Sequence, residues 1–418
     1  MSTSIFTFYT SPTERLAACR NLPSSSMIQY IVLSIILFYL AFHLFLKIRF
    51  RFWSVQPVFH MHNVQYWLAP PGLLQHALPP KTKYFDDTIA CKPFSCTTDH
   101  ERSLFCCLIQ NHYLNDKGKA TYAPSQRDVL AYLEGHQQDP YVTLNREAFI
   151  DSGNPVQGYA AERRLASAMT SRTVECILHG KSMPISLVDF LCVHQAKRKQ
   201  GVAPRTIYTH YRKSRALGAP AAFLFKREGD INFMVPMVVY EAVAFKTSAL
   251  AKPNFRIPNT ITCRLITGAD INLFYHFLDE IKEAFGCFVA PSVSHIKHMV
   301  EEKQLFVCLV MDRDSAVGCY IFRDPHTSYD GKASVECNGS FFVQAERSLG
   351  WDCFPNALTL VKQVLPFDIV LIENISNNDV IIGKMLTRQV PMWKCPMAYY
   401  LYNFIYRPFL SNDVFIAV

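Results

Sequence analysis

The stretch from Ser186 to Pro204 (SLVDFLCVHQAKRKQGVAP) constrains the fold most, because a strand pattern runs through a basic turn directly into a helix start. Residues 187–193 are apolar and partly β-branched with one charge, which predicts a strand buried on both faces. Pro204 suits a first helical position. The free N–H groups of that helix start, with three cations at residues 197–199, favour a bound anion such as a diphosphate. A plain strand, turn and helix with a solvated basic loop is the alternative.

The composition narrows the class of protein. A chain of 418 residues that is half hydrophobic can bury one large core or two ordinary ones. Its 42 basic and 34 acidic residues form no long basic tract with interleaved aromatics, which argues against nucleic acid as a partner. The 14 cysteines lack the spacing of a zinc site, so we expect reduced cysteines, mostly in the core, and no metal.

Residues 28–46 are uncharged throughout and close to the roughly 20 residues that span a bilayer core. We interpret them as a single transmembrane anchor behind a polar, disordered tail over residues 1–27. A cleaved signal peptide or a buried core helix is the alternative. The flanking basic residues are Arg15 and Arg20 before the span and Lys47, Arg49 and Arg51 after it. This small excess predicts a single-pass membrane protein whose body faces the cytoplasm.

Several strings resemble a known enzyme family. The spacing Arg198-x-x-Gly201-x-Ala203 is similar to the pyrophosphate-binding signature of the GNAT acyltransferase superfamily. The string FLCVH at residues 190–194, followed by VAP, resembles one branch of that superfamily, the glycylpeptide N-myristoyltransferases. FWSVQPV at residues 52–58 is close to the FWxTQPV of the same family, where the aromatic pair lines the acyl-CoA cleft. An interfacial aromatic belt at the end of the membrane span is the other interpretation of that pair.

The resemblance continues in islands and has gaps. NALTLVK and YYLYNF, which end at residues 362 and 404, nearly match the family, and residues 165–174 resemble one of its strands. The family motifs GxGDG, YTAG and YWHRSLN have no counterpart here, and residues 389–396 read QVPMWKCP instead of the first of them. The acidic run that binds the peptide in the family is largely absent, although Tyr122 and Ser125 of the adjoining aromatic stretch are kept.

The resemblance implies an α/β fold with a mixed sheet, made of two tandem GNAT-like units behind the membrane helix. The first unit would span residues 47–251 and bind acyl-CoA. The second would span residues 252–418 and contribute the peptide site. The Pro-containing segment KPNFRIP, which begins at Lys252, marks the boundary.

The family pattern assigns the site residues. Those implied to bind the cofactor are Arg51, Phe52, Trp53, Phe190, Leu191, Cys192, Val193, Arg198, Lys199, Gly201, Val202 and Ala203. Those implied to bind the peptide are Tyr122, Ser125, Tyr400 and Tyr402. The backbone N–H groups of Phe190 and Leu191 would form an oxyanion hole if the strand splays there.

The general base would be the carboxylate of Val418, since the family uses its terminal carboxylate. An α-carboxyl with a pKa near 3.5 is a weak base toward an ammonium near 8, so burial would have to bring the two values closer. The apolar ending DVFIAV suits a strand that delivers this carboxylate, although it also suits a plain core strand.

The implied activity is transfer of a myristoyl group from myristoyl-CoA to the N-terminal glycine amine of proteins. Two alternatives stay open. One is a catalytically inactive acyl-CoA-binding protein or scaffold at the membrane, motivated by the missing motifs. The other is an acyltransferase that uses a different acyl chain or acceptor.

Overall fold

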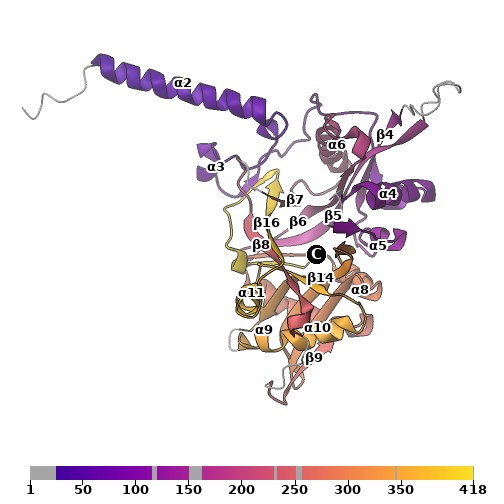
Figure 1. Ribbon diagram of the computed structural model, residues 1–418. Coiled ribbons are helices and arrows are strands. Elements are labelled where there is room, and N and C mark those ends of the chain that lie inside the picture. The colour runs from indigo at the N-terminus through magenta and orange to yellow at the C-terminus, as the bar shows by residue number, and fades with distance from the viewer. Residues whose placement is uncertain are drawn as a thin grey trace, which may run out of the picture. The chain divides into compact units, whose positions relative to one another are not determined.

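The computed structural model describes residues 25–114, 120–149, 162–229, 233–250, 257–343 and 346–417 (Figure 1). The chain divides into two compact units, Met1–Gln56 and Pro57–Val418, which are described separately. The predicted division at residue 252 falls on residues outside the described part of the chain and stays a prediction. The disordered tail predicted over residues 1–27 lies almost wholly outside it as well.

The first unit contains helix α2 (Ser25–Arg49), followed by the 3₁₀ helix η2 (Trp53–Val55). The segment Met27–Arg49 has a mean hydropathy of 2.3 and is long and apolar enough to cross a membrane. An unbroken run without Gly or Pro explains why one helix forms here. An apolar N-terminal helix of sufficient length is therefore confirmed. Phe52 meets Trp53 edge to face, with 5.0 Å between ring centroids.

The second unit is built on a large mixed sheet, with 16 strands among the described residues. Its main path runs β18, β10, β5, β6, β7, β16, β8, β15, β14, β12, β11, β9. The bounds in chain order are β2 (Ala90–Pro93), β3 (Ala120–Tyr122), β4 (Tyr141–Phe149), β5 (Glu162–Leu178), β6 (Lys181–Val193), β7 (Phe223–Glu228), β8 (Val238–Lys246), β9 (Ile261–Leu265), β10 (Cys287–Ala290), β11 (Leu305–Asp312), β12 (Ser315–Arg323), β13 (Thr327–Tyr329), β14 (Lys332–Phe342), β15 (Ile369–Glu373), β16 (Trp393–Tyr402) and β18 (Val414–Ile416). A two-stranded pair, β1 (Gly72–Leu73) with β17 (Phe404–Ile405), lies apart from it.

The helices gather beside two parts of the sheet (Figure 1). The helices near the β4 and β5 part are α4 (Asp99–His112), α5 (Gln126–Ala131) and α6 (Val202–Ala216). Those around the β14 and β9 part include α8 (Val293–Glu301), α9 (Leu349–Asp352), α10 (Phe354–Lys362) and α11 (Asn378–Leu386). The remaining helices are α3 (Val64–Leu68) and α7 (Ile271–Ala284). Capping boxes at Thr98 and Ser125 fix the starts of α4 and α5.

The sequence predicted the strand and the helix on either side of the basic turn, with a small error at one boundary. The strand expected at residues 187–193 is the second half of β6. The helix expected near Pro204 begins two residues earlier, at Val202, because Gly201 adopts a left-handed backbone with φ 75° and ends the turn there.

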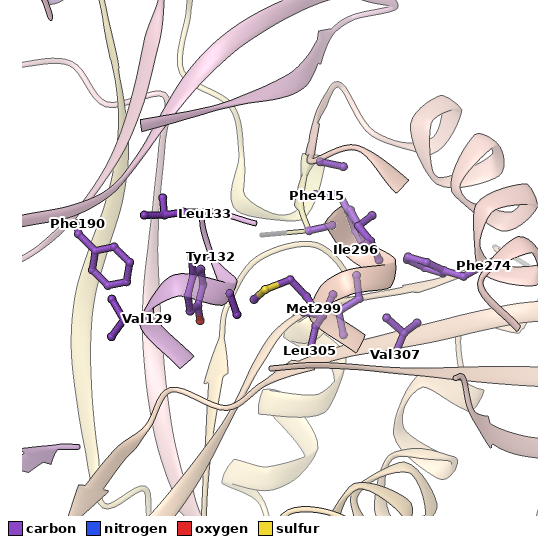
Figure 2. Packing of buried hydrophobic residues seen from close by; sticks show 14 of the residues in the cluster. Val129, Tyr132, Leu133, Phe190, Phe274, Ile296, Met299, Leu305, Val307 and Phe415 are labelled. Atoms are coloured by element: carbon purple, nitrogen blue, oxygen red, sulfur yellow. The ribbon is translucent and has the colours of Figure 1, made fainter. Parts of the chain in front are cut away.

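One hydrophobic cluster joins elements from before and after residue 252. Figure 2 shows Phe190, Tyr132 and Leu133 on one side and Met299, Ile296 and Phe274 on the other, with Phe415 among them. This cluster therefore links the parts of the chain before and after residue 252, while a second cluster, which includes Phe306, Tyr320 and Phe354, is built mostly from residues after 252. Because burial of apolar area is the main stabilising term, we expect the two halves to unfold together.

The chain's end lies inside this core. Strand β18 pairs in parallel with β10, Phe415 is fully buried, and the N–H of Ala417 donates to the carbonyl of Val289 at 2.8 Å. The predicted buried strand at the tail is confirmed. Val418 lies outside the described residues, so the role of its carboxylate stays a prediction.

Candidate functional site

Strands β6 and β7 part in the middle of the sheet. They pair in parallel only at Ser186 with Phe223 and at Leu187 with Leu224. Beyond Leu187, β6 stays paired with β5 out to Val193, while β7 continues along β16 to Glu228. From Val188 onward one edge of β6 thus has no strand partner in the described part of the chain. This opening leaves that edge of β6 without a strand beside it, in the section where the family resemblance implies a splay.

Phe190 lies on the parted section, in a β-bulge of β6 where Asp189 and Phe190 lie opposite the single residue Thr170 of β5. The bulge falls between Met169 and Ser171, and the N–H of Phe190 donates to the hydroxyl oxygen of Thr170 at 3.2 Å. Leu191 pairs with Met169 on the same ladder. The ring of Phe190 is buried against aromatic neighbours, as Figure 2 shows for Tyr132. The oxyanion role of these two amides stays a prediction, and any oxyanion would compete with the Thr170 hydroxyl for the Phe190 N–H.

Arg198 fastens the basic turn to the body of the protein. Its guanidinium donates to the carbonyl of Val193 at 3.1 Å and also to the carbonyl of His112, at the end of α4. Lys197 is engaged as well, since its ammonium lies 3.1 Å from the Ala148 carbonyl and 3.2 Å from the Glu147 carboxylate. Two of the three cations in the predicted anion site therefore shape the turn.

Lys199 and the start of α6 are the parts of the turn that remain open to a ligand. The Lys199 residue is exposed, with a left-handed backbone at φ 64°. The 15-residue helix α6 has no side-chain cap at Gly201, so the first-turn N–H groups of Val202 and Ala203 have no such acceptor. A cation beside an uncapped helix N-terminus suits an anion, because the helix dipole and the side chain act in the same direction.

Two histidines that sequence reasoning missed lie beside this turn. The rings of His112 and His194 are 4.0 Å apart. Burial lowers the pKa of both, and nearby cations such as Arg198 lower it further. Both rings are therefore neutral at pH 7, and the charge of the turn comes from its lysines and arginine. Their separation of 82 positions hid the pair, whereas the fold joins the ends of α4 and β6.

Cys192 is a core thiol. It is buried, its sulfur donates to the carbonyl of Leu108 at 3.6 Å, and burial raises its pKa to about 12. A neutral buried thiol is a poor nucleophile.

The predicted peptide-binding residues fall into two groups. Tyr122 lies in β3, with its ring 5.4 Å from that of Tyr113, and Tyr113 in turn meets Phe190 at 5.5 Å. Ser125 caps α5 by accepting from the Asp128 N–H at 3.2 Å, so it has a structural role.

Tyr400 and Tyr402 lie on the face of the sheet opposite to that of Tyr399 and Lys226. Tyr400 stacks on Phe225, Tyr402 meets Tyr211 edge to face, and both tyrosines are buried. Side chains alternate along a strand, so Tyr399 points the other way, with its ring 6.0 Å from the Lys226 ammonium. Arg51, Phe52 and Trp53 belong to the first unit, and their part in cofactor binding stays a prediction. Among the described residues, no group of three or more His, Cys, Asp or Glu could hold a metal ion.

The sheet, the parted strands, the basic turn and the uncapped helix define the class of protein as an α/β protein with the GNAT-type acyltransferase fold. Within that class, the chain shares the fold of N-myristoyltransferase. It superposes on the crystal structure of Saccharomyces cerevisiae N-myristoyltransferase with bound myristoyl-CoA with a TM-score of 0.65 and 13% identity, over 86% of this chain and 94% of that one. A second structure of that enzyme with myristoyl-CoA superposes with a TM-score of 0.65 and 14% identity, over 86% of this chain and 89% of that one. A third, with myristoyl-CoA and inhibitors, has a TM-score of 0.65 and 13% identity, over 86% of this chain and 91% of that one.

At this identity the likeness shows the fold. No protein-family model and no curated protein sequence matches the chain. The predicted α/β class, GNAT-type fold and resemblance to N-myristoyltransferases are confirmed at the level of structure.

Proposed function

We propose that this protein transfers a long acyl chain, in the first instance myristoyl, from acyl-CoA to the N-terminal glycine amine of a protein. The observation that carries the proposal is the parting of β6 and β7 beyond Leu187, followed directly by the basic turn and the uncapped start of α6. The same fold in the yeast enzyme holds myristoyl-CoA. In this arrangement the diphosphate of the cofactor would lie at Lys199, Val202 and Ala203, and the thioester would lie along the open edge of β6.

The open edge of β6 supports the reacting carbonyl. As the amine attacks the thioester carbon, negative charge grows on the carbonyl oxygen. The N–H groups of Phe190 and Leu191 would donate to it, and one such donor is typically worth about 3 kcal/mol in the transition state. The Phe190 N–H already points at an oxygen, that of Thr170. Thr170 belongs to β5, on the paired side of β6, so donation to a carbonyl at the open edge requires the Phe190 peptide to turn away from Thr170.

The proton balance requires a base near the amine. The glycine ammonium must lose one proton before it attacks, and the amine's second proton finally protonates the departing CoA thiolate. We assign the first proton to the carboxylate of Val418. The neighbouring Ala417 is buried and hydrogen-bonded to Val289, which is where a carboxylate with a raised pKa is expected. Removing Val418, or adding one residue after it, should slow transfer while leaving acyl-CoA binding intact.

We further propose that α2 spans the membrane, with the body on the cytoplasmic side. Its length and hydropathy support this, and three basic residues follow the apolar run. Extraction from membranes should require detergent. Release by salt or alkali would contradict the proposal.

A catalytically inactive acyl-CoA-binding protein is the second candidate. The occupied Phe190 N–H favours it, as does the absence of a GxGDG counterpart before β16. The two candidates differ in one assay with the full chain in detergent. Both bind myristoyl-CoA more tightly than acetyl-CoA by calorimetry, but only the enzyme releases an N-myristoylated peptide, detected by mass spectrometry. An acyltransferase for another chain would transfer a shorter or longer acyl group from a mixed set of acyl-CoAs.

A further inference from the structure

Four charged side chains meet where the strands of the two halves join. Lys226 of β7 contacts the carboxylate of Glu373 in β15 and lies 3.5 Å from Glu336 in β14. Arg323, at the end of β12, donates to Glu336 through Nε at 3.1 Å and through a second N–H. Tyr240 donates to the other oxygen of Glu373 at 3.2 Å. None of these residues belongs to the acyl-CoA site proposed above.

The cations of this cluster are more open than the acids. The side chains of Lys226 and Arg323 keep 27% and 24% of their exposure, whereas those of Glu336 and Glu373 keep 9% and 3%. Both carboxylates accept hydrogen bonds from the two cations. Two of the three ammonium donors and two of the five guanidinium donors are used within the cluster, and the rest have no hydrogen-bond partner in the described part of the chain. The surface offered to a ligand is therefore one of N–H donors.

The balance of charge also favours an anion. Burial raises the pKa of Glu373 to about 7, although Lys226 opposes the shift. Burial alone would lower the pKa of Lys226, but Glu373 and Glu336 raise it well above its usual value. The raised pKa of Glu373 weakens the negative charge that the two cations face.

The cluster borders the place where acyl transfer is proposed. Tyr132 contacts the ring of Phe190, with centroids 5.7 Å apart, and its pKa is raised by burial and lowered by Arg323. The pKa values of Tyr113 and Tyr122 respond to Arg323 in the same way. Lys226 lies on β7 two residues beyond Leu224, where β7 has parted from β6, and Arg323 shares the Glu336 carboxylate with Lys226, so the cluster flanks the opening between the two strands.

We propose that Arg323 and Lys226 bind a carboxylate of the acceptor, so that this protein selects acidic acceptor peptides. The proposal rests on the proposed function for its account of what the acceptor is. A lysine of the acceptor would be repelled by the two cations here, and both carboxylates are already paired with those cations. Of the other acids nearby, Asp189 is held by Arg172 at 2.9 Å, and Glu228 is exposed at the end of β7. Buried Glu336 and Glu373 act here as positioning residues that aim the cations.

Variants must remove charge in balanced pairs. Lys226→Met alone leaves a buried carboxylate without its partner, which strongly destabilises a fold. Lys226→Met with Glu373→Gln removes one charge of each sign, and the amide oxygen can still accept from Tyr240. Arg323→Gln with Glu336→Gln does the same for the second pair. Lys394→Met with Glu241→Gln is the matched control, an exposed pair 3.4 Å apart that also joins adjacent strands.

Peptide binding tests the proposal without requiring transfer. The full chain in detergent is saturated with a thioether analogue of myristoyl-CoA. Fluorescence anisotropy then measures glycine-initiated peptides of one length that carry Asp, Asn or Lys in turn at positions two to six. At one or more of these positions, Asp peptides should bind about tenfold more tightly than Lys peptides, as expected for a charge-assisted hydrogen bond. The preference should fall to about twofold in either site double variant and persist in the control.

Three outcomes would overturn the proposal: equal binding of Asp and Lys peptides, tighter binding of Lys peptides, or an acidic preference that survives in both site variants. Thermal unfolding checks that each variant is folded. The first two outcomes are measured on the unmodified protein, so they do not depend on the folding of the variants. A separate transfer assay distinguishes failure of the proposed enzyme activity from failure of the proposed recognition site. An acidic binding preference without transfer contradicts the proposed enzyme and supports this recognition site, whereas transfer without the preference does the opposite.

Discussion

The amide nitrogen of Phe190 and the hydroxyl oxygen of Thr170 are 3.2 Å apart at the β-bulge between β6 and β5, in the section of β6 that has parted from β7. This hydrogen bond satisfies a buried donor at the point where the strand edge opens. It also means that the oxygen of Thr170 holds the place of the acceptor that a thioester carbonyl would supply. The relationship makes the oxyanion hypothesis testable by removing one oxygen atom.

Thr170→Val should lower the free energy of unfolding of the unliganded protein by about 1–3 kcal/mol, because it leaves the buried N–H of Phe190 without an acceptor. Bound acyl-CoA should recover part of this loss by supplying a carbonyl oxygen. Thermal unfolding with and without myristoyl-CoA measures both effects. A loss of stability that ligand leaves unchanged would contradict an oxyanion role for this amide.

Lys199→Ala and Arg198→Ala should separate affinity from stability. Lys199 is exposed, so its removal should weaken acyl-CoA binding severalfold at low salt and leave the melting temperature unchanged. Arg198 bonds two backbone carbonyls, so its removal should lower the unfolding free energy by about 1.5–3 kcal/mol as well. Calorimetry and thermal unfolding read the two quantities. Unchanged acyl-CoA affinity in Lys199→Ala would argue against the proposed diphosphate position.

Stability should fall on mild acidification, partly through His210. This residue is fully buried, bonded to Thr143 and Ser171 at 2.8 Å each, and burial lowers its pKa to about 3. The unfolded chain, with a pKa near 6.5, then binds more protons between those two values. Its contribution is therefore fully present above pH 6.5 and is lost as pH falls below it.

His210→Gln should reduce the pH dependence accordingly. One proton corresponds to about 1.4 kcal/mol per pH unit, so the loss of unfolding free energy between pH 6.5 and 5 should shrink by about 2 kcal/mol. Urea unfolding at the two pH values gives the comparison. An unchanged difference would show that His210 is not the neutral, buried group described here.

Cys192→Ala should retain myristoyl transfer at a rate within a fewfold of the unmodified protein. The thiol is buried, and its pKa is raised to about 12, so it is protonated at neutral pH. The change removes buried sulfur and should cost stability of the order of 1 kcal/mol. Steady-state transfer rates provide the test. Complete loss of transfer in a folded variant would point to a covalent acyl-cysteine route.

Local sequence was enough to predict the strand, turn and helix around residues 187–204. Strand burial, a glycine at a left-handed position and helical spacing are all written within a few residues of one another. The buried tail strand was predictable for the same reason, from an apolar run at residues 414–417. The family resemblance carried the fold further than periodicity could, because spaced strings fix the order of several elements at once.

What escaped prediction depends on strand pairing. Lys226, Arg323, Glu336 and Glu373 come from four strands, and only the order of the sheet brings them together. The position of Thr170 opposite Phe190 depends on a bulge that shifts the register by one residue. Which of Tyr399 and Tyr400 lies near Lys226 likewise depends on the face of the sheet that each side chain occupies. The sequence showed the cations of the turn, but the carbonyls that engage Arg198 are distant in the chain.

Myristoyl transfer to a glycine amine tests the central claim most directly. The full chain in detergent is incubated with myristoyl-CoA and a mixture of glycine-initiated peptides, together with the same peptides acetylated at their N-termini, and the products are resolved by mass spectrometry. The account predicts that the free-amine peptides alone gain a myristoyl group, with acidic members reacting first. Binding of myristoyl-CoA without any acylated peptide, over a set that includes acidic members, would contradict it.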